Sequence, residues 1–434
     1  MKKILSIILA AGMLLSMAGC QSEDKPEKTD QTEEPTGAIE ETLDVVIYDR
    51  GEDEAYWNGI VAAFEEANPG VKIEMTLSKD AAYELRDRIL SGNSPDFVYL
   101  PSDEESGVTE ALIKDHAMEP LSEVESAAAS LMLKGAVDNN QCRPYDDRKM
   151  YLAPLFFETE GFIYNKTLMQ ENGWNIPTTW DQLIELAEKS DEKNISVLSY
   201  AGREPEQFVG IFASALFPTI GTEQMNDLLN CSEEAWKDNE NVKAFIEKIE
   251  TIKKLVASGS STKTPEDVRD DLTEGKVLFI SGTSDDLEDL AEDENYQYGF
   301  FLYPKLSDEG EKTAIVSFSE MFIPVEAKNK DFAKKFMIFQ YSDTAARIAA
   351  ETLGELMPVQ KIASMAGQYE LEPSLKAVYQ SFGTSVYSPK FVVKSAENET
   401  LSDEFTSLIV SVFKSEVTSE DFSEKMIEYI QEFN

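Results

Sequence analysis

Hydrophobic and polar positions change period several times along residues 41–100, which predicts strands alternating with helices. Strands are expected where apolar residues run together or alternate with polar ones, at Leu43–Tyr48, Val71–Met75 and Asp96–Leu100. Between the first two strands, apolar residues recur at the i, i+3, i+4 and i+7 spacing of one helix face: Trp57, Ile60, Val61 and Phe64. Ala81–Leu90 predicts the next helix. On this pattern Trp57 is a core residue.

The same alternation returns after residue 150. Strands are expected at Gly161–Tyr164, Val277–Ile280 and Tyr298–Leu302. Thr179 with Gln182 predicts a capping box that opens a helix over Trp180–Lys189. Asp331–Ala350 predicts one long amphipathic helix, and the last thirty or so residues predict further helix. Strands that alternate with helices through short turns indicate the α/β class, with a largely parallel sheet covered on both faces.

The first forty residues differ from the rest of the chain. Lys2 and Lys3 precede a short apolar run, and a polar stretch follows from Gln21 to Gly37. This order is typical of a secretory signal peptide. The apolar run, Ile4–Met17, is shorter than the roughly 20 residues that a membrane-spanning helix needs.

The segment that ends in Ala18-Gly19-Cys20 resembles the lipobox of bacterial lipoproteins. The resemblance implies cleavage before Cys20, whose thiol would carry a diacylglycerol, and two acyl chains suffice for stable anchoring. We therefore expect a signal peptide over residues 1–19, and a lipidated cysteine with a disordered acidic tether over residues 20–40. The expected location is the extracellular face of the cell membrane. The alternative is an ordinary signal peptide with an incidental cysteine.

Charge and length narrow the expected partners. The 434 residues include 39 basic and 82 acidic side chains, which gives a formal net charge of −43. Such a field repels phosphate backbones and anionic headgroups, so we expect no nucleic-acid partner and a membrane contact through lipid only. With 42% hydrophobic residues over this length, two lobes are expected rather than one compact unit.

Histidine and cysteine content argues against several kinds of site. His116, the single histidine, leaves too few imidazoles for histidine-rich zinc sites, Ser-His-Asp triads or Cys-His dyads, and we expect it at the surface where a helix ends. Cys142 and Cys231 either form one disulfide or, as we favour, stay reduced. The acidic run Asp285–Asp289 lacks the spacing of a calcium loop and predicts a solvated helix face. We expect no metal and no cofactor.

Five segments carry more specific patterns, in this order along the chain: Phe64–Ile73, Ser91–Val98, Pro154–Lys166 followed by Pro177–Leu183, Glu274–Lys276 ahead of an apolar strand, and Asp331–Phe336. Together they resemble the extracellular solute-binding proteins of ABC importers, family 1, in its carbohydrate-binding branch. The most specific segment is Pro154–Lys166, which ends in Tyr-Asn-Lys.

The resemblance implies a two-lobed, periplasmic-binding-protein-like (type II) α/β fold, with the ligand in a cleft between lobes that several hinge crossovers join. It divides the chain into one lobe of residues 41–153 and 301–343 and another of residues 154–300 and 344–434. It also implies the function. The protein would be a monomeric, lipid-anchored receptor and not an enzyme. It would close on a solute, with a mono- or oligosaccharide expected first, and deliver it to the permease of an ABC importer.

Candidate ligand-binding residues follow from the position of pockets in α/β sheets, outside the carboxyl ends of strands. Sugars offer hydroxyls to charged and amide side chains and an apolar face to aromatic rings. The candidates that adjoin predicted strands are Tyr48, Asp49 and Arg50 after the first strand, Asp103 after the third, and Phe318 and Glu320 ahead of a late strand.

The resemblance adds three positions. Glu158 aligns with a family position just past a crossover that often touches sugar. Ser284 stands where the family usually carries an aromatic ring, which puts the usual stacking contact in doubt. Glu355 lies in a segment that resembles a family loop near the cleft.

Other functions stay open at this point. The acid-rich loops and the missing ring at Ser284 would suit a cationic solute such as a polyamine or a peptide. A secreted glycosidase with paired carboxylates is a remote alternative, because 82 acidic residues make any single pair uninformative and no nucleophile motif is present. A binding protein of this kind could also serve a sensor instead of a permease.

Overall fold

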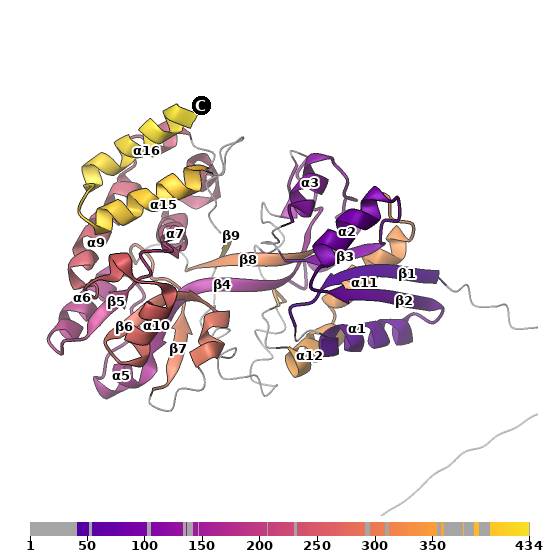
Figure 1. Ribbon diagram of the computed structural model, residues 1–434, viewed down its shortest axis with the longest axis horizontal. Helices are drawn as coiled ribbons and strands as arrows, with labels where there is room; N and C mark the ends of the chain where they lie inside the picture. Colours follow the sequence, from indigo (N-terminus) through magenta and orange to yellow (C-terminus); the bar gives the residue numbers. More distant parts are fainter. Residues whose placement is uncertain are drawn as a thin grey trace, which may run out of the picture. The chain divides into compact units, whose positions relative to one another are not determined.

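The computed structural model describes residues 41–51, 54–101, 106–132, 136, 142–145, 147–205, 207–229, 232–290, 296–308, 312–353, 357–359, 376, 386–389 and 400–433 (Figure 1). The expected signal peptide and tether lie outside the described residues, and so do four positions discussed above: Cys20, Asp103, Cys231 and Glu355.

The described strands form one mixed sheet: β1 (Glu41–Tyr48), β2 (Val71–Ser78), β3 (Phe97–Leu100), β4 (Ala153–Asn165), β5 (Ser196–Ser199), β6 (Val277–Thr283), β7 (Tyr298–Phe301), β8 (Thr313–Phe322) and β9 (Val386–Pro389). Their order is β2-β1-β3-β8-β4-β6-β5, with β7 also paired to β4 and β9 to β8. The α/β class is therefore confirmed.

The expectation of a largely parallel sheet is wrong. β1 runs parallel to β2 and β3, and β5 runs parallel to β6, as βαβ units require. The two longest strands, β4 and β8, are antiparallel to each other, β8 is antiparallel to β3, and β4 is antiparallel to β6 and β7. The sheet is mixed because β4 and β8 cross it side by side in opposite directions (Figure 1).

The α-helices of the described residues are α1 (Glu54–Ala67), α2 (Ala81–Leu90), α3 (Val108–Lys114), α4 (Ser122–Ala128), α5 (Lys166–Glu171), α6 (Trp180–Asp191), α7 (Gln207–Leu229), α8 (Glu233–Trp236), α9 (Glu240–Ile252), α10 (Pro265–Thr273), α11 (Lys330–Gln340), α12 (Asp343–Thr352), α15 (Thr400–Phe413) and α16 (Ser419–Phe433). Short 3-10 turns lie at Lys253–Leu255, Ser260–Thr262 and Asp285–Leu290.

The helix α1 illustrates how the pattern specifies the first of the hydrophobic cores, which lies around β1, β3, α11 and α12. Trp57, Ile60 and Phe64 are buried on one face, as expected. The helix ends where Gly70, at φ +95°, turns the chain into β2, and the backbone N–H of Val71 donates to the carbonyl of Asn68 at 3.1 Å. The Trp57 ring is 0% exposed and packs against Tyr99 at 5.2 Å between ring centroids, so its predicted core role is confirmed.

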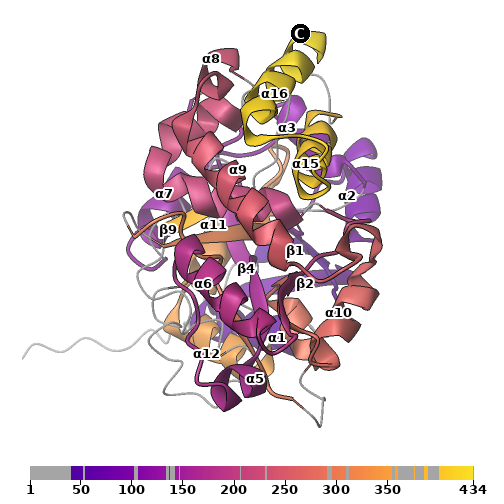
Figure 2. The same ribbon diagram turned by 90° about the vertical axis from the view of Figure 1, so that its left-hand side faces the viewer.

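A second core lies among α6, α7 and α9 and includes the two last helices of the chain, α15 and α16. Figure 2 shows α15 and α16 over α9, in agreement with the contacts between these helices. Trp236 stacks on Phe212 at 5.9 Å and packs against Phe405 at 5.7 Å, and its indole N–H donates to the carbonyl of Leu228. The helices predicted for the last thirty residues are therefore confirmed.

The single helix predicted over Asp331–Ala350 is wrong. Two helices, α11 and α12, meet at Tyr341 and Ser342. The Ser342 hydroxyl accepts a hydrogen bond from the backbone N–H of Ala345, so it caps α12 and ends the continuous helical pattern. The Gln340 side chain at the end of α11 accepts a hydrogen bond from the Tyr56 hydroxyl at 2.8 Å.

The capping box predicted for α6 is also wrong in one detail. Thr179 caps the helix by accepting from the backbone N–H of Gln182 at 3.3 Å, as expected. The Gln182 side chain reaches back to the N–H of Thr178 instead of that of Thr179. Here the chain pairs with Lys305 in a parallel bridge: the N–H of Trp180 donates to the carbonyl of Lys305 at 2.9 Å, and the N–H of Lys305 donates to the carbonyl of Thr178 at 3.1 Å.

The lobe boundaries stay a prediction. Helix α12, which the predicted boundary at residue 343 assigns to the second lobe, packs against α1 and α11. Gly59 of α1 makes room for this packing, since a Cβ there would lie 3.0 Å from the Ile348 side chain. We propose on this basis that the first lobe extends through α12.

Candidate functional site

The pairing of the strands brings four carboxyl ends toward one stretch of β4 and β8. Leu100, the last residue of β3, pairs with Glu320, so β8 residues before 320 extend past the ends of β1 and β3. From the other direction, Thr283 at the end of β6 pairs with Glu160, and β5 runs parallel to β6. Pockets of α/β sheets lie at such carboxyl ends. The candidate site is therefore the part of β4 and β8 that lies between the position paired with Leu100 and the position paired with Thr283.

One face of this stretch is partly exposed, at three positions only, and the other is closed. Glu158 of β4 pairs with Ser317 of β8, and both side chains are half-buried, as is that of Glu160. We call Glu158, Glu160 and Ser317 the central strip. On the opposite face, Phe157 and Phe318 are 4% and 0% exposed, with 6.1 Å between their ring centroids.

The central strip combines acceptors with a hydroxyl. Carboxylates at Glu158 and Glu160 accept hydrogen bonds, and the Ser317 hydroxyl both donates and accepts. The side chain of Glu160 lies against Gly210 of α7, where any Cβ would collide with its carboxylate. Glycine at 210 is thus required for the observed position of Glu160. This set of groups suits a ligand with several hydroxyls or a cation.

The candidates at the end of β1 and just after it, Tyr48, Asp49 and Arg50, lie near the same edge of the sheet as the central strip, but two strands away from β8. In the sheet register, Tyr48 is level with Leu100, so the next residues, Asp49 and Arg50, are level with the β8 residues before Glu320. Two strand spacings correspond to about 10 Å. All three side chains are half-buried. One carboxylate oxygen of Asp49 already accepts from the N–H of Gly51 at 2.7 Å, so this residue also shapes the turn.

Ser284 has a structural role next to the strip. It follows β6 directly and is 6% exposed. Its backbone N–H donates to the carbonyl of Thr159 at 2.9 Å, and its hydroxyl accepts from the Thr159 N–H at 3.4 Å. A serine here extends the pairing of β6 with β4 by one residue.

Phe318 and Glu320 lie within β8, whereas the sequence pattern predicted that they precede a strand; that placement is wrong. Phe318 belongs to the first core. Glu320 is 6% exposed and pairs with Leu100 on one side and Pro154 on the other. Burial, and secondarily the charge of Glu110, raises the pKa of the Glu320 carboxyl to about 8. The side chains of both residues are therefore turned into the protein.

A small cavity of about 50 Å³ lies beside the end of β6. Arg269 of α10 and Asp286 line its polar side and form an ion pair at 3.6 Å, and Asp286 also accepts from the N–H of Thr283 at 2.8 Å. The pair fixes the loop after β6 to α10. The cavity is too small for a sugar ring and holds one or two waters at most.

Sequence reasoning missed Glu160 and Ser317. Both were visible as polar residues in otherwise apolar runs, at every second position of a strand. The predicted strand at Gly161–Tyr164 begins eight residues after the true start of β4 at Ala153, so Glu160 was not expected within a strand. The candidates Asp103 and Glu355 lie outside the described residues.

The expectations for histidine and cysteine agree with the described part of the chain. His116 is exposed after α3 and stacks on Tyr145 at 4.3 Å. Cys142 is a buried free thiol, and burial raises its pKa well above the ordinary value. No group of three or more potential metal-ligating side chains occurs among the described residues. In the same part of the chain, we find no helix with the length and apolar composition needed to cross a membrane.

Known proteins resemble the chain in sequence over part of its length. It is 27% identical over 170 residues to a multiple sugar-binding protein of Streptococcus mutans, and 23% identical over 251 residues to the diacetylchitobiose binding protein NgcE of Streptomyces coelicolor. These alignments cover 38% and 56% of this chain. The chain spans only 37% and 52% of the length of these curated relatives.

Solved structures resemble the chain over nearly its whole length. The bacterial solute receptor AcbH matches with a TM-score of 0.71 at 14% identity, covering 91% of this chain and 99% of that chain. The apo form of RafE from Streptococcus pneumoniae matches with a TM-score of 0.69 at 18% identity, covering 89% and 97%. At these identities the likeness establishes the fold, which is the expected two-lobed fold of solute-binding proteins.

Family membership follows from a match that covers most of the chain. The profile of the bacterial extracellular solute-binding proteins matches residues 49–347, from the turn after β1 to the middle of α12. This range contains all three residues of the central strip. The chain therefore belongs to the bacterial extracellular solute-binding proteins, a family of receptors and not of enzymes.

Proposed function

We propose that the protein is a lipid-anchored extracellular receptor that binds a mono- or oligosaccharide at the central strip and delivers it to the permease of an ABC importer. The observation that carries the proposal is the convergence of four strand ends on Glu158 and Ser317, the half-buried pair on β4 and β8. A ligand held there contacts elements on both sides of the crossing strands, and so favours a closed state over an open one.

The carbohydrate part of the proposal draws on the relatives. The names of the two curated relatives specify sugars and diacetylchitobiose, and a further solved structure of RafE, with a TM-score of 0.58, contains raffinose. The central strip supplies the carboxylates and hydroxyl that bind sugar hydroxyls in pairs. The lipid anchor rests on the lipobox-like segment that ends in Cys20. The permease partner and the monomeric state rest on the family alone.

Thermal unfolding against named solutes tests the ligand. We would measure the midpoint with galactose, raffinose, N,N′-diacetylchitobiose, spermine and oligolysine. A ligand at 100 times its Kd stabilises the folded state by about 2.7 kcal/mol, which is readily measured. Glu158→Gln should weaken binding of the stabilising sugar at least tenfold, since it removes a charged acceptor. Glu188→Gln, at an exposed position of α6, is the matched control and should leave the affinity unchanged.

Two outcomes would change the proposal. Stabilisation by spermine or oligolysine and by no sugar would replace the carbohydrate with a cationic solute, and that binding should weaken steeply with salt. Equal affinity of Glu158→Gln and the parent protein would remove the central strip from the site. For the anchor, Cys20→Ser should abolish incorporation of radiolabelled palmitate and release the protein from the membrane fraction; a variant that is still labelled would refute lipidation at Cys20.

A further inference from the structure

A β-bulge interrupts the pairing of β4 with β8 just before the central strip. Ala153 pairs with Met321 and Pro154 with Glu320, but Phe156 pairs with Ser319. Between these pairs β4 therefore contains one residue more than β8, and that residue is Leu155. An extra residue of this kind disrupts the ladder locally and bends the strand.

The bulge decides which face of the sheet carries Glu158. Side chains alternate between the two faces, so one extra residue reverses the face of every residue that follows. With the bulge, Glu158 pairs with the half-buried Ser317, and Phe157 faces the core. If the register of Ala153 and Pro154 continued unchanged, Glu158 would pair with Val316, which is 1% exposed. The carboxylate would then point into the core.

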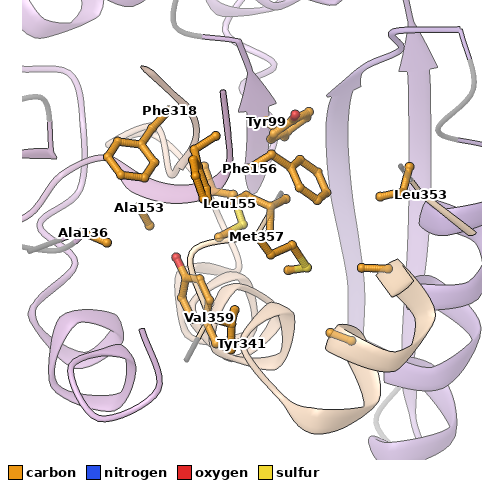
Figure 3. Close-up of a cluster of buried hydrophobic side chains, with 14 of the residues drawn as sticks. Tyr99, Ala136, Ala153, Leu155, Phe156, Phe318, Tyr341, Leu353, Met357 and Val359 are labelled. Carbon is orange, nitrogen blue, oxygen red and sulfur yellow. The ribbon is translucent and has the colours of Figure 1, made fainter. Parts of the chain in front are cut away.

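Tyr341 holds the strand at this point. Its hydroxyl donates to the carbonyl of Pro154 at 2.7 Å, and the ring is 1% exposed. A bulge disrupts the ladder locally, so a buried carbonyl beside it needs a donor, and Tyr341 supplies one to the carbonyl of Pro154. Figure 3 shows Tyr341, Leu155 and Phe156 in one buried cluster. Leu155 is 0% exposed, so the bulged residue is itself anchored by packing.

The break between α11 and α12 fixes Tyr341 in turn. The N–H of Tyr341 donates to the carbonyl of Ile338, and the N–H of Ser342 donates to that of Phe339, which closes the last turn of α11. On the preceding residue, the Gln340 side chain is tied to the Tyr56 hydroxyl of α1. The closed turn fixes the backbone that carries the Tyr341 ring, and the Gln340 bond ties α11 to α1.

We propose that Tyr341 is a positioning residue for solute binding: its hydroxyl stabilises the bulge at Leu155 and so keeps Glu158 on the solvent-facing side of β4. The inference rests on the proposed function only in assigning Glu158 to the ligand. The orientation of Glu158 itself can be measured without any ligand.

Thiol accessibility reports the orientation. Glu158→Cys and Phe157→Cys are made separately in the full chain, and alkylation by iodoacetamide at each position is timed by peptide mass spectrometry. With the bulge in place, the thiol at position 158 should react at least tenfold faster than the thiol at position 157. Adding Tyr341→Phe should lower this ratio at least threefold, and deleting Leu155 should reverse it.

Tyr56→Phe is the matched control, because it removes only a buried tyrosine hydroxyl that bonds Gln340 at the same helix end, and keeps the ring that packs against Phe156 of β4. It should leave the rate at position 158 unchanged. General destabilisation speeds alkylation of the buried thiol at position 157 more than that of the accessible thiol at position 158, so it lowers the ratio by itself. Loss of the bulge is distinguished because it also slows the thiol at position 158, which destabilisation does not. A rate at position 158 that is as fast in Tyr341→Phe as in the parent overturns the inference, even if the Leu155 deletion fails to fold.

Solute affinity separates this inference from the proposed function. Tyr341→Phe should weaken binding of raffinose or N,N′-diacetylchitobiose, whichever stabilises the parent protein, by about tenfold. If alkylation at position 158 slows in Tyr341→Phe while Glu158→Gln binds as the parent does, the bulge positions Glu158 as inferred and the proposed binding site is wrong. If Glu158→Gln loses affinity while the rate at position 158 stays constant, the site stands and Tyr341 does not position it.

Discussion

Replacing Glu320 by glutamine should stabilise the protein, and more so at higher pH. Glu320 lies at the junction of β3, β8 and β4 and is 6% exposed. Its raised pKa, about 8, means that the folded protein keeps a proton on this carboxyl at neutral pH. Glutamine has nearly the same shape as the protonated acid and carries no ionisable group, so it should fit the same space.

The magnitude follows from proton linkage. In the unfolded chain the carboxyl has the ordinary glutamate pKa of 4.5, and in the folded protein its pKa is about 8. The contribution of Glu320 to stability is fully present below pH 4.5 and is lost as the pH rises through 8, by up to about 1.4 kcal/mol per pH unit. Between pH 5 and pH 8, the advantage of Glu320→Gln over the parent protein should therefore grow by about 3 kcal/mol.

Urea unfolding at pH 5, 6, 7 and 8 measures this difference. Groups other than Glu320 titrate alike in both proteins, and their effects cancel when the two free energies of unfolding are subtracted at each pH. Glu326→Gln, at an exposed position shortly after β8, is the control and should show a constant difference. If the advantage of Glu320→Gln is the same at pH 5 and pH 8, the burial argument for this carboxyl is refuted.

Substitutions at three further positions test the packing and one helix cap, each by urea unfolding. Trp236→Ala should lower the free energy of unfolding by about 3–5 kcal/mol, because it empties the space against Phe212 in the second core; a loss below 1 kcal/mol would mean that the core refills. Ser342→Ala removes the cap of α12 and should cost about 1 kcal/mol, whereas Ser342→Asp should restore it. Gly161→Ala should cost about 2–3 kcal/mol, since its Cβ would lie 2.5 Å from the backbone oxygen of Phe301; a neutral effect would contradict the close approach of β7 to β4.

The elements of residues 41–100 were predictable because each has its own signal. The apolar face of α1, the Asn-Pro-Gly turn before β2 and the bounds of α2 all follow from short-range patterns. The strand β4 was mostly missed for the opposite reason. Its first part, Ala153–Phe157, is buried on both faces and includes Pro154, so neither alternation nor strand propensity identifies it.

The site was only partly predictable, because its geometry depends on pairings between distant residues. Glu158 could be named from a resemblance, but Ser317 becomes a candidate only when β8 is known to lie beside β4. Phe318 and Glu320 adjoin Ser317 on β8 but are buried. Side chains alternate between the two faces of a strand, so both lie on the face opposite to that of Ser317. Nothing local to residue 341 predicts its contact with Pro154, which spans 187 residues.

The packing of the last helices has a consequence for the order of folding. The second core contains residues from Phe162 to Ile430, and Phe405, Phe422 and Met426 are all fully buried in it. The core cannot close until α16 has been synthesised, so α5 to α9 expose a large apolar surface for as long as the chain is still emerging. For the export that we propose, this delay would keep the chain unfolded during its passage through a secretion channel. Truncation before α16 should leave the second core open and the chain prone to aggregation.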